Sequence, residues 1–399
     1  MKKKFYPLVE NPFREKDLKS AIKVIKSGKI TIGKYTSNFE KIFSKKLGAK
    51  NTLMVNSGSS ANLLAFQCLI NPYRKKRLKI GDQVLIPSVC WSTSLWPIIQ
   101  SGLKPVFVDV DIDTLNINLL DLKKKITKKT KALMLVHVLG NSTNMDKLRK
   151  IIKRNKLILV EDTCESLGSK YKNKYLGTFG DFSAFSFYTS HQISAGEGGM
   201  ISCKSKDDYE IIKSLRSHGW SRGLKKENQI AKQFPNLDKR FIFYNSGFNL
   251  RPTDVSAAIG LSQFKDMNKL IKIRNYNRDL IVNSFKKDKV INDNLIFIKP
   301  NLNIKPAWFG IPILLRNSKI RKKFLDQLDK NGVETRPIIS GNFLKQPSIY
   351  KYKINTKSIF NNSDLINNCG FFIGLPLTKI NNNKLAKLVN IFRKSLLAN

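Results

Sequence analysis

The 399-residue chain has few cysteines, histidines and acidic residues, and no long apolar run. Its five cysteines include no CxC or CxxC pair, which argues for reduced thiols and against a zinc site or disulfide framework. Apolar runs such as 132–140 are far shorter than the roughly 20 residues of a membrane span. No apolar stretch or cleavage site follows the basic residues 1–7, so no signal peptide is expected. We therefore expect a cytoplasmic protein with no membrane span.

Acidic residues are scarce beside basic ones. Against 72 Lys and Arg stand 29 Asp and Glu, which gives a formal net charge of +43. A basic surface attracts nucleic acids whatever its fold. The lysines are spread along the whole chain, however, so we favour a compositional bias of the source organism, with an anionic small substrate as a compatible minor cause. We expect no nucleic-acid partner.

Strand and helix patterns alternate along residues 61–217. Strands are predicted at 83–87, 105–110, 133–139, 157–161, 182–187 and 200–203, and helices at 61–69, 91–102, 119–126, 145–155 and 207–217. This alternation is typical of an α/β fold with a mainly parallel sheet and helices on both faces. Ligands of such a sheet bind at the carboxyl ends of the strands.

The remaining sequence predicts a smaller C-terminal unit. Residues 219–239 have no clear period and are expected to form a surface loop. A long helix from 252 to about 285 should lead to strands at 295–298, 309–315 and 334–339 and to helices at 321–330 and 384–397. We expect a large domain of residues 1–265, with an N-terminal segment 1–30, and a small α/β domain of residues 266–399.

Small residues before a predicted helix suggest a phosphate site. In Asn-Ser-Gly-Ser-Ser-Ala-Asn, residues 56–62, free N–H groups and hydroxyls beside Gly58, Ser59 and Ser60 can hold a phosphate against the helix dipole. Taken alone, the motif is better explained by a simple helix N-cap. Ser186 ends another strand, where a hydroxyl can contact a ligand or bond to the backbone.

Other residues follow strand ends in the same way. Asp162 ends an apolar strand, and its carboxylate either faces a ligand or caps a helix. Glu165 is a helper in the site or a first-turn residue that favours the helix dipole. The ring of Trp91 can stack on a ligand ring, whereas an ordinary core tryptophan is the more common alternative.

Only three histidines occur in the chain. His137 lies in the apolar run 133–139 and is expected to be a satisfied core or strand-end residue. His218 follows a helix and either meets substrate together with Arg222 or complements the helix C-terminus. His191 lies in the glycine-rich segment 186–199, and we favour a functional role as an acid or base.

Two segments resemble a known cofactor site. Ser-Phe-Tyr-Thr-Ser-His-Gln-Ile-Ser-Ala-Gly-Glu-Gly-Gly at 186–199 and Glu-Asp-Thr-Cys-Glu at 161–165 resemble the pyridoxal phosphate (PLP) site of the DegT/DnrJ/EryC1/StrS sugar aminotransferase family. The resemblance covers nearly the whole chain and implies a fold-type I, aspartate aminotransferase-like PLP enzyme. In that family a lysine stands at the position of His191 and holds the cofactor as a Schiff base. Histidine moves protons but cannot form that link.

The resemblance implies roles for individual residues. Asp162 matches the partner of the pyridine nitrogen, Trp91 the stacking ring and Glu165 a position near the ring hydroxyl. Asn249 matches an asparagine that reaches the cofactor phosphate of the neighbouring subunit, which implies a homodimer with shared sites. The phosphate contacts on the same subunit match Gly58, Ser59, Ser60 and Ser186. Candidates for the carboxylate of the amino donor or the nucleotide phosphates, by charge type and placement only, are Arg222, Arg251, Arg336 and Lys345. His218 is a further candidate for substrate binding, beside Arg222.

The branch of the family with histidine for lysine comprises PLP-dependent nucleotide-sugar 3-dehydratases. The resemblance therefore implies that L-glutamate converts PLP to pyridoxamine phosphate and that the enzyme removes the C3 hydroxyl of a 4-keto-6-deoxyhexose, with His191 and Glu165 as catalytic residues. Segments 217–222, 247–252, 308–310 and 335–345 look most like the branch acting on GDP-4-keto-6-deoxymannose. Gln192 departs from this branch, which usually has a second histidine there.

Three alternatives stay open. An aminotransferase would need a displaced lysine, and the nearest downstream one, Lys204, lies well outside the segment. The relatives that act on CDP-linked 4-keto-6-deoxyglucose carry a [2Fe-2S] insert, whereas the loop 219–239 has no cysteine to ligate a cluster. A silent paralogue that only binds a nucleotide sugar would not need Asp162, Ser186 and the phosphate turn to stay intact.

Overall fold

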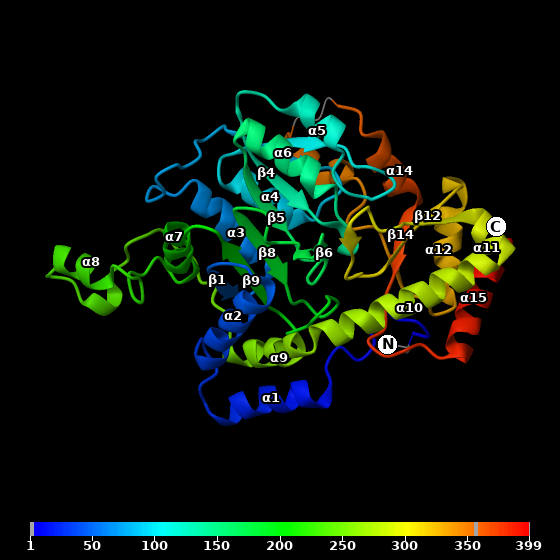
Figure 1. The fold of residues 1–399 in the computed structure, drawn as a ribbon, viewed down its shortest axis with the longest axis horizontal. Helices are drawn as coiled ribbons and strands as arrows, with labels where there is room; N and C mark the ends of the chain where they lie inside the picture. Colours follow the sequence, from blue (N-terminus) through cyan, green and yellow to red (C-terminus); the bar gives the residue numbers. More distant parts are fainter. Residues whose placement is uncertain (1–3, 355–357, 399) are drawn as a thin grey trace.

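The computed structural model describes residues 4–354 and 358–398 and centres on one large sheet (Figure 1). The order of its seven strands is β1-β9-β8-β5-β4-β2-β3, and all but β9 run parallel to one another. The strands are β1 (Thr52–Val55), β2 (Gln83–Pro87), β3 (Lys104–Val108), β4 (Thr130–Val136), β5 (Ile158–Asp162), β8 (Phe182–Ser186) and β9 (Gly199–Cys203). The predicted mainly parallel α/β fold is confirmed.

Helices cover both faces of this sheet because successive strand side chains point to opposite sides. In β4, Met134 packs in the core formed with α3 (Gly58–Leu69), α4 (Ser92–Gln100) and α7 (Lys206–Arg216). Its neighbours Leu133 and Leu135 pack on the opposite face, against α5 (Leu119–Lys125) and α6 (Met145–Asn155). Beside them, α2 (Lys34–Leu47) and α9 (Asp254–Lys265) cover the end of the sheet near β1.

A smaller antiparallel sheet lies beside the large one, with the order β10-β12-β14-β13. Its strands are β10 (Leu295–Phe297), β12 (Ile311–Leu315), β13 (Thr335–Arg336) and β14 (Gly370–Ile373). The long helix α10 (Met267–Lys287) runs from α9 to this sheet, and both ends of the chain lie near it (Figure 1). The helices of this part are α11 (Lys289–Asn294), α12 (Arg321–Lys330), α13 (Pro347–Lys351), α14 (Asn361–Cys369) and α15 (Asn382–Leu397).

Segments distant in sequence join the two parts. A third sheet pairs β11 (Ile304–Lys305) with β6 (Lys170–Tyr171), which also pairs with β7 (Lys174–Tyr175). Near the N-terminus, the Tyr6 hydroxyl donates to the Gly374 carbonyl at 3.0 Å, and its backbone pairs with Val333. The predicted domain division at residues 265 and 266 falls between α9 and α10 and stays a prediction.

The structure differs from the sequence prediction in several elements. The single long helix after residue 252 is divided at Asp266, whose carboxylate accepts hydrogen bonds from Arg14 and Lys16 near α1 (Glu15–Lys26). The expected loop 219–239 contains the short helix α8 (Glu227–Gln233). The expected strand 334–339 is limited to β13, since the next residue, Pro337, has no N–H to donate. The short strands β1 and β14 were not predicted.

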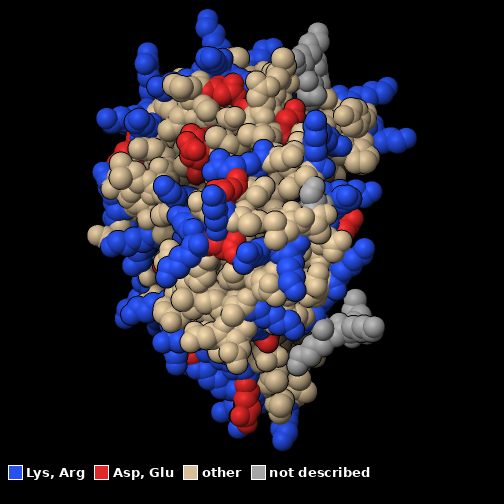
Figure 2. Space-filling model, turned by 90° about the vertical axis from the view of Figure 1, so that its right-hand side faces the viewer, with Lys and Arg blue, Asp and Glu red and all other residues tan. Residues whose placement is uncertain are grey.

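Basic side chains are dispersed over the surface. Figure 2 shows Lys and Arg across the whole visible face, with acidic and uncharged residues between them. Within residues 4–354 and 358–398, no helix is both long and apolar enough to cross a membrane. The cytoplasmic location stays a prediction.

Candidate active site

A cavity of about 860 Å³ lies at the carboxyl ends of the parallel strands. The small sheet supplies part of its wall through Arg336 and Phe372, Phe309 adds to it from just before β12, and the N-terminal segment adds Leu8 and Val9. The predicted site residues that line it are Gly58, Ser59, Trp91, Asp162, Glu165, Ser186, His191 and Arg336. Trp91 is 56% exposed, so it is a wall residue of the cavity and not the core residue that we considered as the alternative.

The predicted phosphate turn lies at the N-terminus of α3. The Ser57 side chain caps this helix by accepting a hydrogen bond from the Ser60 N–H at 3.1 Å. A Cβ on Gly58 would lie 2.7 Å from both the Ser186 Cβ and the Cys164 Sγ, so only glycine allows this close approach. The turn therefore places a helix N-terminus beside the Ser186 hydroxyl, a combination suited to a phosphate. Ser60 does not line the cavity.

Asp162 is held in one orientation at the end of β5. Its Oδ2 accepts hydrogen bonds from Asn62 Nδ2 at 2.9 Å and from Ser94 Oγ at 2.7 Å. Its Oδ1 accepts from the Cys164 N–H at 3.1 Å. Three donors stabilise the charged form of a carboxylate and fix its direction. Sequence reasoning missed the support from Asn62 and Ser94, although both lie in the segments discussed for Gly58 and Trp91.

His191 lies on the histidine loop, which we define as residues 187–198 between β8 and β9. Its Nδ1 bonds to the Cys164 carbonyl, so Nδ1 carries the proton and Nε2 keeps its lone pair. The ring packs edge-on against Phe309, with 5.0 Å between the ring centroids. Burial lowers the pKa of His191 from 6.5 to about 4, so the imidazole is neutral at pH 7. The side chain is therefore in the form that accepts a proton.

The pKa of Glu165 is shifted in the opposite direction, upward. Burial raises its pKa from 4.5 to about 8, and the neighbouring Asp162 also raises it. The Leu139 N–H donates to Glu165 Oε2 at 3.0 Å. The carboxyl is therefore protonated at pH 7 and can donate a hydrogen bond into the cavity. A second unpredicted contact orients this turn, since Gln192 Nε2 donates to the Glu165 carbonyl.

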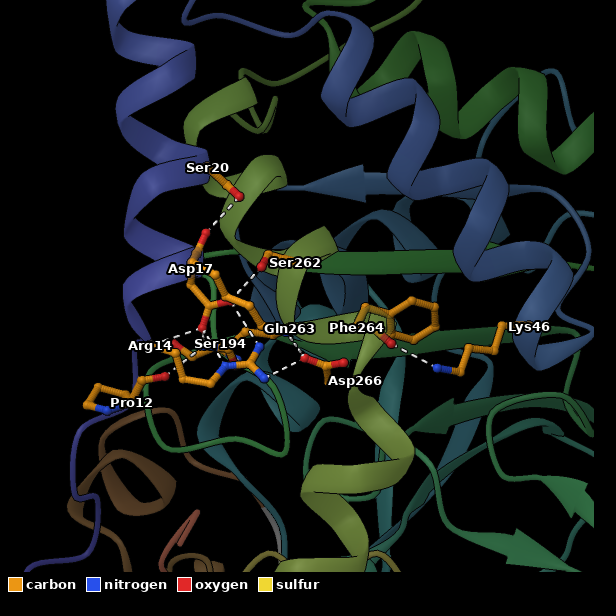
Figure 3. A network of polar contacts seen from close by, with 11 residues as sticks. Pro12, Arg14, Asp17, Ser20, Lys46, Ser194, Ser262, Gln263, Phe264 and Asp266 are labelled. Carbon is orange, nitrogen blue, oxygen red and sulfur yellow. Dashed lines mark hydrogen bonds and ion pairs between the residues drawn. The ribbon is translucent and has the colours of Figure 1, made fainter.

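The histidine loop is also fixed from the side of α1 and α9, as Figure 3 shows. The Ser194 N–H donates to Gln263 Oε1 at 2.8 Å. Gln263 Nε2 donates in turn to the Pro12 carbonyl at 2.7 Å and to the buried Asp17 carboxylate at 3.2 Å. Asp17 also accepts from Arg14 Nε at 2.9 Å. This network ties the loop to the N-terminal helix.

His137 behaves as expected from the sequence. It is fully buried, with Nδ1 2.9 Å from Ser142 Oγ and Nε2 3.0 Å from Glu161 Oε2. Backbone N–H groups of Gly177 and Gly180 also donate to Glu161, and the His137 contact lowers the pKa of Glu161 against the effect of burial. This cluster is a satisfied structural unit beneath the cavity.

Five other predicted site residues do not line the cavity of their own chain: His218, Arg222, Asn249, Arg251 and Lys345. Lys345 forms an ion pair with Asp364 at 2.8 Å. Arg251 donates to Asn249 Oδ1 at 3.0 Å and lies over the Trp220 ring, which the His218 ring also contacts. These side chains, apart from Lys345, belong to the region after α7.

Residues 12–392 match the DegT/DnrJ/EryC1/StrS aminotransferase family. The chain belongs to this family. A GDP-4-keto-6-deoxy-D-mannose 3-dehydratase from Escherichia coli O55:H7 is 37% identical over 379 residues, which are 92% of this chain and 95% of that protein. The enzyme of the same name from Yersinia pseudotuberculosis is 34% identical over 394 residues, 98% of each chain.

Solved structures agree with this assignment. The E. coli GDP-4-keto-6-deoxy-D-mannose 3-dehydratase with bound hydrated PLP has a TM-score of 0.89 and 36% identity, covering 99% of this chain and 100% of its own. The aminotransferase PseC from Helicobacter pylori, 24% identical with a TM-score of 0.86, shares the fold. The aminotransferase-like PLP fold predicted from the sequence is confirmed.

The side chains of the cavity fit PLP. The α3 turn with Ser186 suits its phosphate, the fixed Asp162 carboxylate suits a protonated ring nitrogen, and the exposed Trp91 ring offers a surface for stacking. Asn62 Oδ1 is buried without a hydrogen-bond partner within the described part of the chain. No lysine is among the described residues that line the cavity. The site can hold PLP by these contacts but not by a covalent lysine bond.

Proposed function

We propose that the protein is a PLP-dependent nucleotide-sugar 3-dehydratase. Its substrate in this proposal is GDP-4-keto-6-deoxymannose, and its amino donor is L-glutamate. The observation that carries the proposal is His191, a neutral base in the cavity at the position of the family lysine, in a cavity whose described walls contain no lysine. The similarity to two GDP-4-keto-6-deoxy-D-mannose 3-dehydratases over more than nine tenths of the chain supports the substrate.

In this proposal, different residues of the site bind different parts of the cofactor. Gly58, Ser59 and Ser186 hold the phosphate, and Asp162 pairs with the ring nitrogen. When bound, the cofactor carries the amino group and takes up the electron pair released beside the sugar C4. Trp91 covers one side of the site and excludes water from the reacting atoms.

His191 moves the protons of the reaction. Its Nε2 accepts a proton and then delivers it to the departing C3 hydroxyl, which leaves as water. The Nδ1 bond to Cys164 keeps the ring in the required tautomer throughout. Glu165, protonated at pH 7 and lining the cavity, would be available to donate a hydrogen bond to the bound cofactor.

The overall reaction balances without a further reductant. Glutamate is oxidised to 2-oxoglutarate and supplies two electrons. These electrons reduce C3 of the sugar, where a C–H bond takes the place of the C–O bond. The amino group leaves as ammonia, one for each sugar deoxygenated, because none of the described residues that line the cavity is a lysine that could pass it on. The product is a 3,6-dideoxy-4-keto sugar that contains no nitrogen.

Product analysis tests this proposal. The protein is incubated with PLP, glutamate and GDP-4-keto-6-deoxymannose, and with other 4-keto nucleotide sugars in parallel, and products are identified by mass spectrometry. We expect loss of the C3 oxygen and one ammonia per sugar. A stable amino sugar in good yield without ammonia would identify an aminotransferase instead, like the GDP-perosamine synthase of E. coli O157:H7 that is 30% identical over 306 residues.

The site is also proposed to be shared between two subunits of a homodimer. Asn249 and Arg251 lie outside the cavity of their own chain and are therefore available to a partner's cavity. Between them and α7, large apolar side chains are exposed on the projecting segment around α8 (Figure 1), as expected for a surface that packs against another subunit. They are Phe234, Leu237, Phe241 and Phe243, of which Phe243 is 62% exposed.

Mixing two inactive variants tests shared sites. A His191→Asn subunit paired with an Asn249→Ala subunit has one doubly defective and one intact site if the sites are shared. We expect turnover to reappear after the two variants are unfolded and refolded together. Absence of recovery in a mixture shown to contain heterodimers would place Asn249 and His191 in the same subunit's site.

A further inference from the structure

A buried arginine on α10 contacts the histidine loop directly. The Arg274 side chain is 3% exposed. Its Nη1 donates to the His191 carbonyl at 3.1 Å, and its Nη2 donates to the Phe309 carbonyl at 3.2 Å and to the Ser190 carbonyl at 3.5 Å. Throughout residues 4–354 and 358–398 no carboxylate forms an ion pair with it. One guanidinium thus joins two parts of the cavity wall.

The two parts that Arg274 joins also meet at their rings. The His191 ring packs edge-on against Phe309, at an interplanar angle of 72°. Fixing both carbonyls therefore fixes the backbone under the imidazole and the wall against which the imidazole rests. We propose that Arg274 is a positioning residue for His191: by clamping the histidine loop to the segment just before β12, Arg274 sets the direction of His191 Nε2. This role rests on the proposed function of His191 as the proton carrier.

The geometry of the guanidinium suits this task. Its planar fork presents several N–H donors in fixed directions, so one side chain can serve three carbonyls that a lysine ammonium cannot reach together. Two other side chains hold the loop: Gln263 bonds at Ser194 on the far side, and Gln192 Nε2 donates to the Ala307 carbonyl at 2.9 Å. Arg274 differs from both because it bonds to the backbone carbonyl of His191 itself.

Like burial, the positive charge of Arg274 lowers the pKa of His191. The titratable groups around His191 are Arg274 from α10, Asp162, Cys164 and Glu165 from the end of β5 and its turn, and Tyr188 from its own loop. Burial is the largest cause of the lowered pKa of His191, and the hydrogen bond to the Cys164 carbonyl opposes it; of the two neighbouring charges, Arg274 lowers this pKa and Asp162 raises it. Burial lowers the pKa of Arg274 itself to about 10, so it remains charged at pH 7. Removing this charge should therefore raise the pKa of His191.

The test compares Arg274→Gln with a matched control on the next turn of the same helix. Arg278 is also a buried arginine, but it donates to the Ile298 carbonyl at 2.7 Å and lies over the Trp308 ring, away from the histidine loop. Hydrogen exchange of the PLP-loaded protein, followed by mass spectrometry, reports on the loop without any assay of turnover. The His191 N–H and the Ala195 N–H are bonded within the loop, to Tyr188 and Phe187, and serve as probes.

We expect amides 190–196 to exchange about 10- to 100-fold faster in Arg274→Gln, and not in Arg278→Gln, since the histidine loop loses its bonds to a charged donor only in the former. Turnover should fall by about 100-fold in Arg274→Gln through displacement of the base. The acid limb of its pH profile should move to higher pH. Sugar binding, measured as KM, should change less than kcat.

A second variant keeps the test decisive. Arg274→Lys retains the charge and loses the fork, so we expect faster loop exchange with a smaller movement of the acid limb. If Arg274→Gln does not fold, this variant alone carries the test. Loop exchange and pH profile equal to those of Arg278→Gln would overturn the proposal and leave Arg274 a packing residue. If loop exchange is faster in Arg274→Gln but the wild-type protein makes an amino sugar, the proposed dehydratase function is refuted and the role of Arg274 in holding the loop is retained.

Discussion

Replacing His191 by Asn is the most direct test of the site. Among the described residues that line the cavity, the substitution leaves no imidazole except that of the buried, fully bonded His137. The contacts proposed for the cofactor phosphate and ring nitrogen, at Gly58, Ser186 and Asp162, are left unchanged. We therefore expect PLP affinity, measured by titration of protein fluorescence, to change little. Turnover should fall by about 10² to 10⁴-fold, the usual contribution of general acid–base catalysis.

The same variant makes a separate prediction for stability. The pKa of His191 is lowered on folding from 6.5 to about 4, so the unfolded chain binds this proton more readily than the folded protein. The contribution of His191 to the free energy of unfolding is fully present above pH 6.5 and is lost as the pH falls toward 4. The difference between the two pKa values sets an upper limit of about 3 kcal/mol for this loss. In His191→Asn the loss should be absent.

Two assays follow this prediction: urea unfolding at pH 7 and at pH 4.5, and product formation at pH 7. We expect the unfolding free energy of the wild type to fall further between the two pH values than that of His191→Asn. Near-normal turnover in the variant would refute the catalytic argument and move the base to another residue, with Tyr188 of the same loop next in line. An identical pH dependence of unfolding would refute the burial argument, because His191 would then titrate alike in both states.

Three further predictions concern the cofactor and its surroundings. Borohydride treatment and peptide mapping should yield no pyridoxyl-lysine, because no described residue lining the cavity is a lysine, and any such adduct contradicts the site. Burial raises the pKa of Glu165 to about 8, so turnover should fall above pH 8 as the carboxyl loses its proton. Glu165→Gln should remove this alkaline limb of the pH profile. A wild-type profile in the variant would exclude Glu165 as a proton donor in the reaction. Gly58→Ala places a methyl group 2.7 Å from Ser186 Cβ, an overpacking that costs about 1–3 kcal/mol. An equilibrium titration should therefore show PLP binding weakened by roughly 10-fold or more. Unchanged affinity would show that the turn can relax.

The strand and helix pattern was largely predictable because it depends on local periodicity. The helices at 145–155 and 321–330 and the strand at 83–87 have the predicted bounds. Apolar residues repeat at the helical period in the two helices, and the strand is a short continuous apolar run, typical of a strand buried on both faces. The division of α9 from α10 was not predictable, because the contacts at Asp266 come from Arg14 and Lys16, far away in sequence. Short strands such as β14 have too few residues to show a period.

The sequence by itself determined which chemistry the chain carries. A histidine at 191, an aspartate at 162 and small residues at 56–62 are identities that no fold can alter, and they exclude a covalent lysine bond at this position. Only the tertiary structure decided how these groups are oriented and charged. Asn62 and Ser94 reach Asp162 from 100 and 68 positions away, and Arg274 reaches His191 from 83 positions away. The pKa shifts of His191 and Glu165 likewise arise from burial, which is set by packing between distant segments and not by the residues adjacent in the chain.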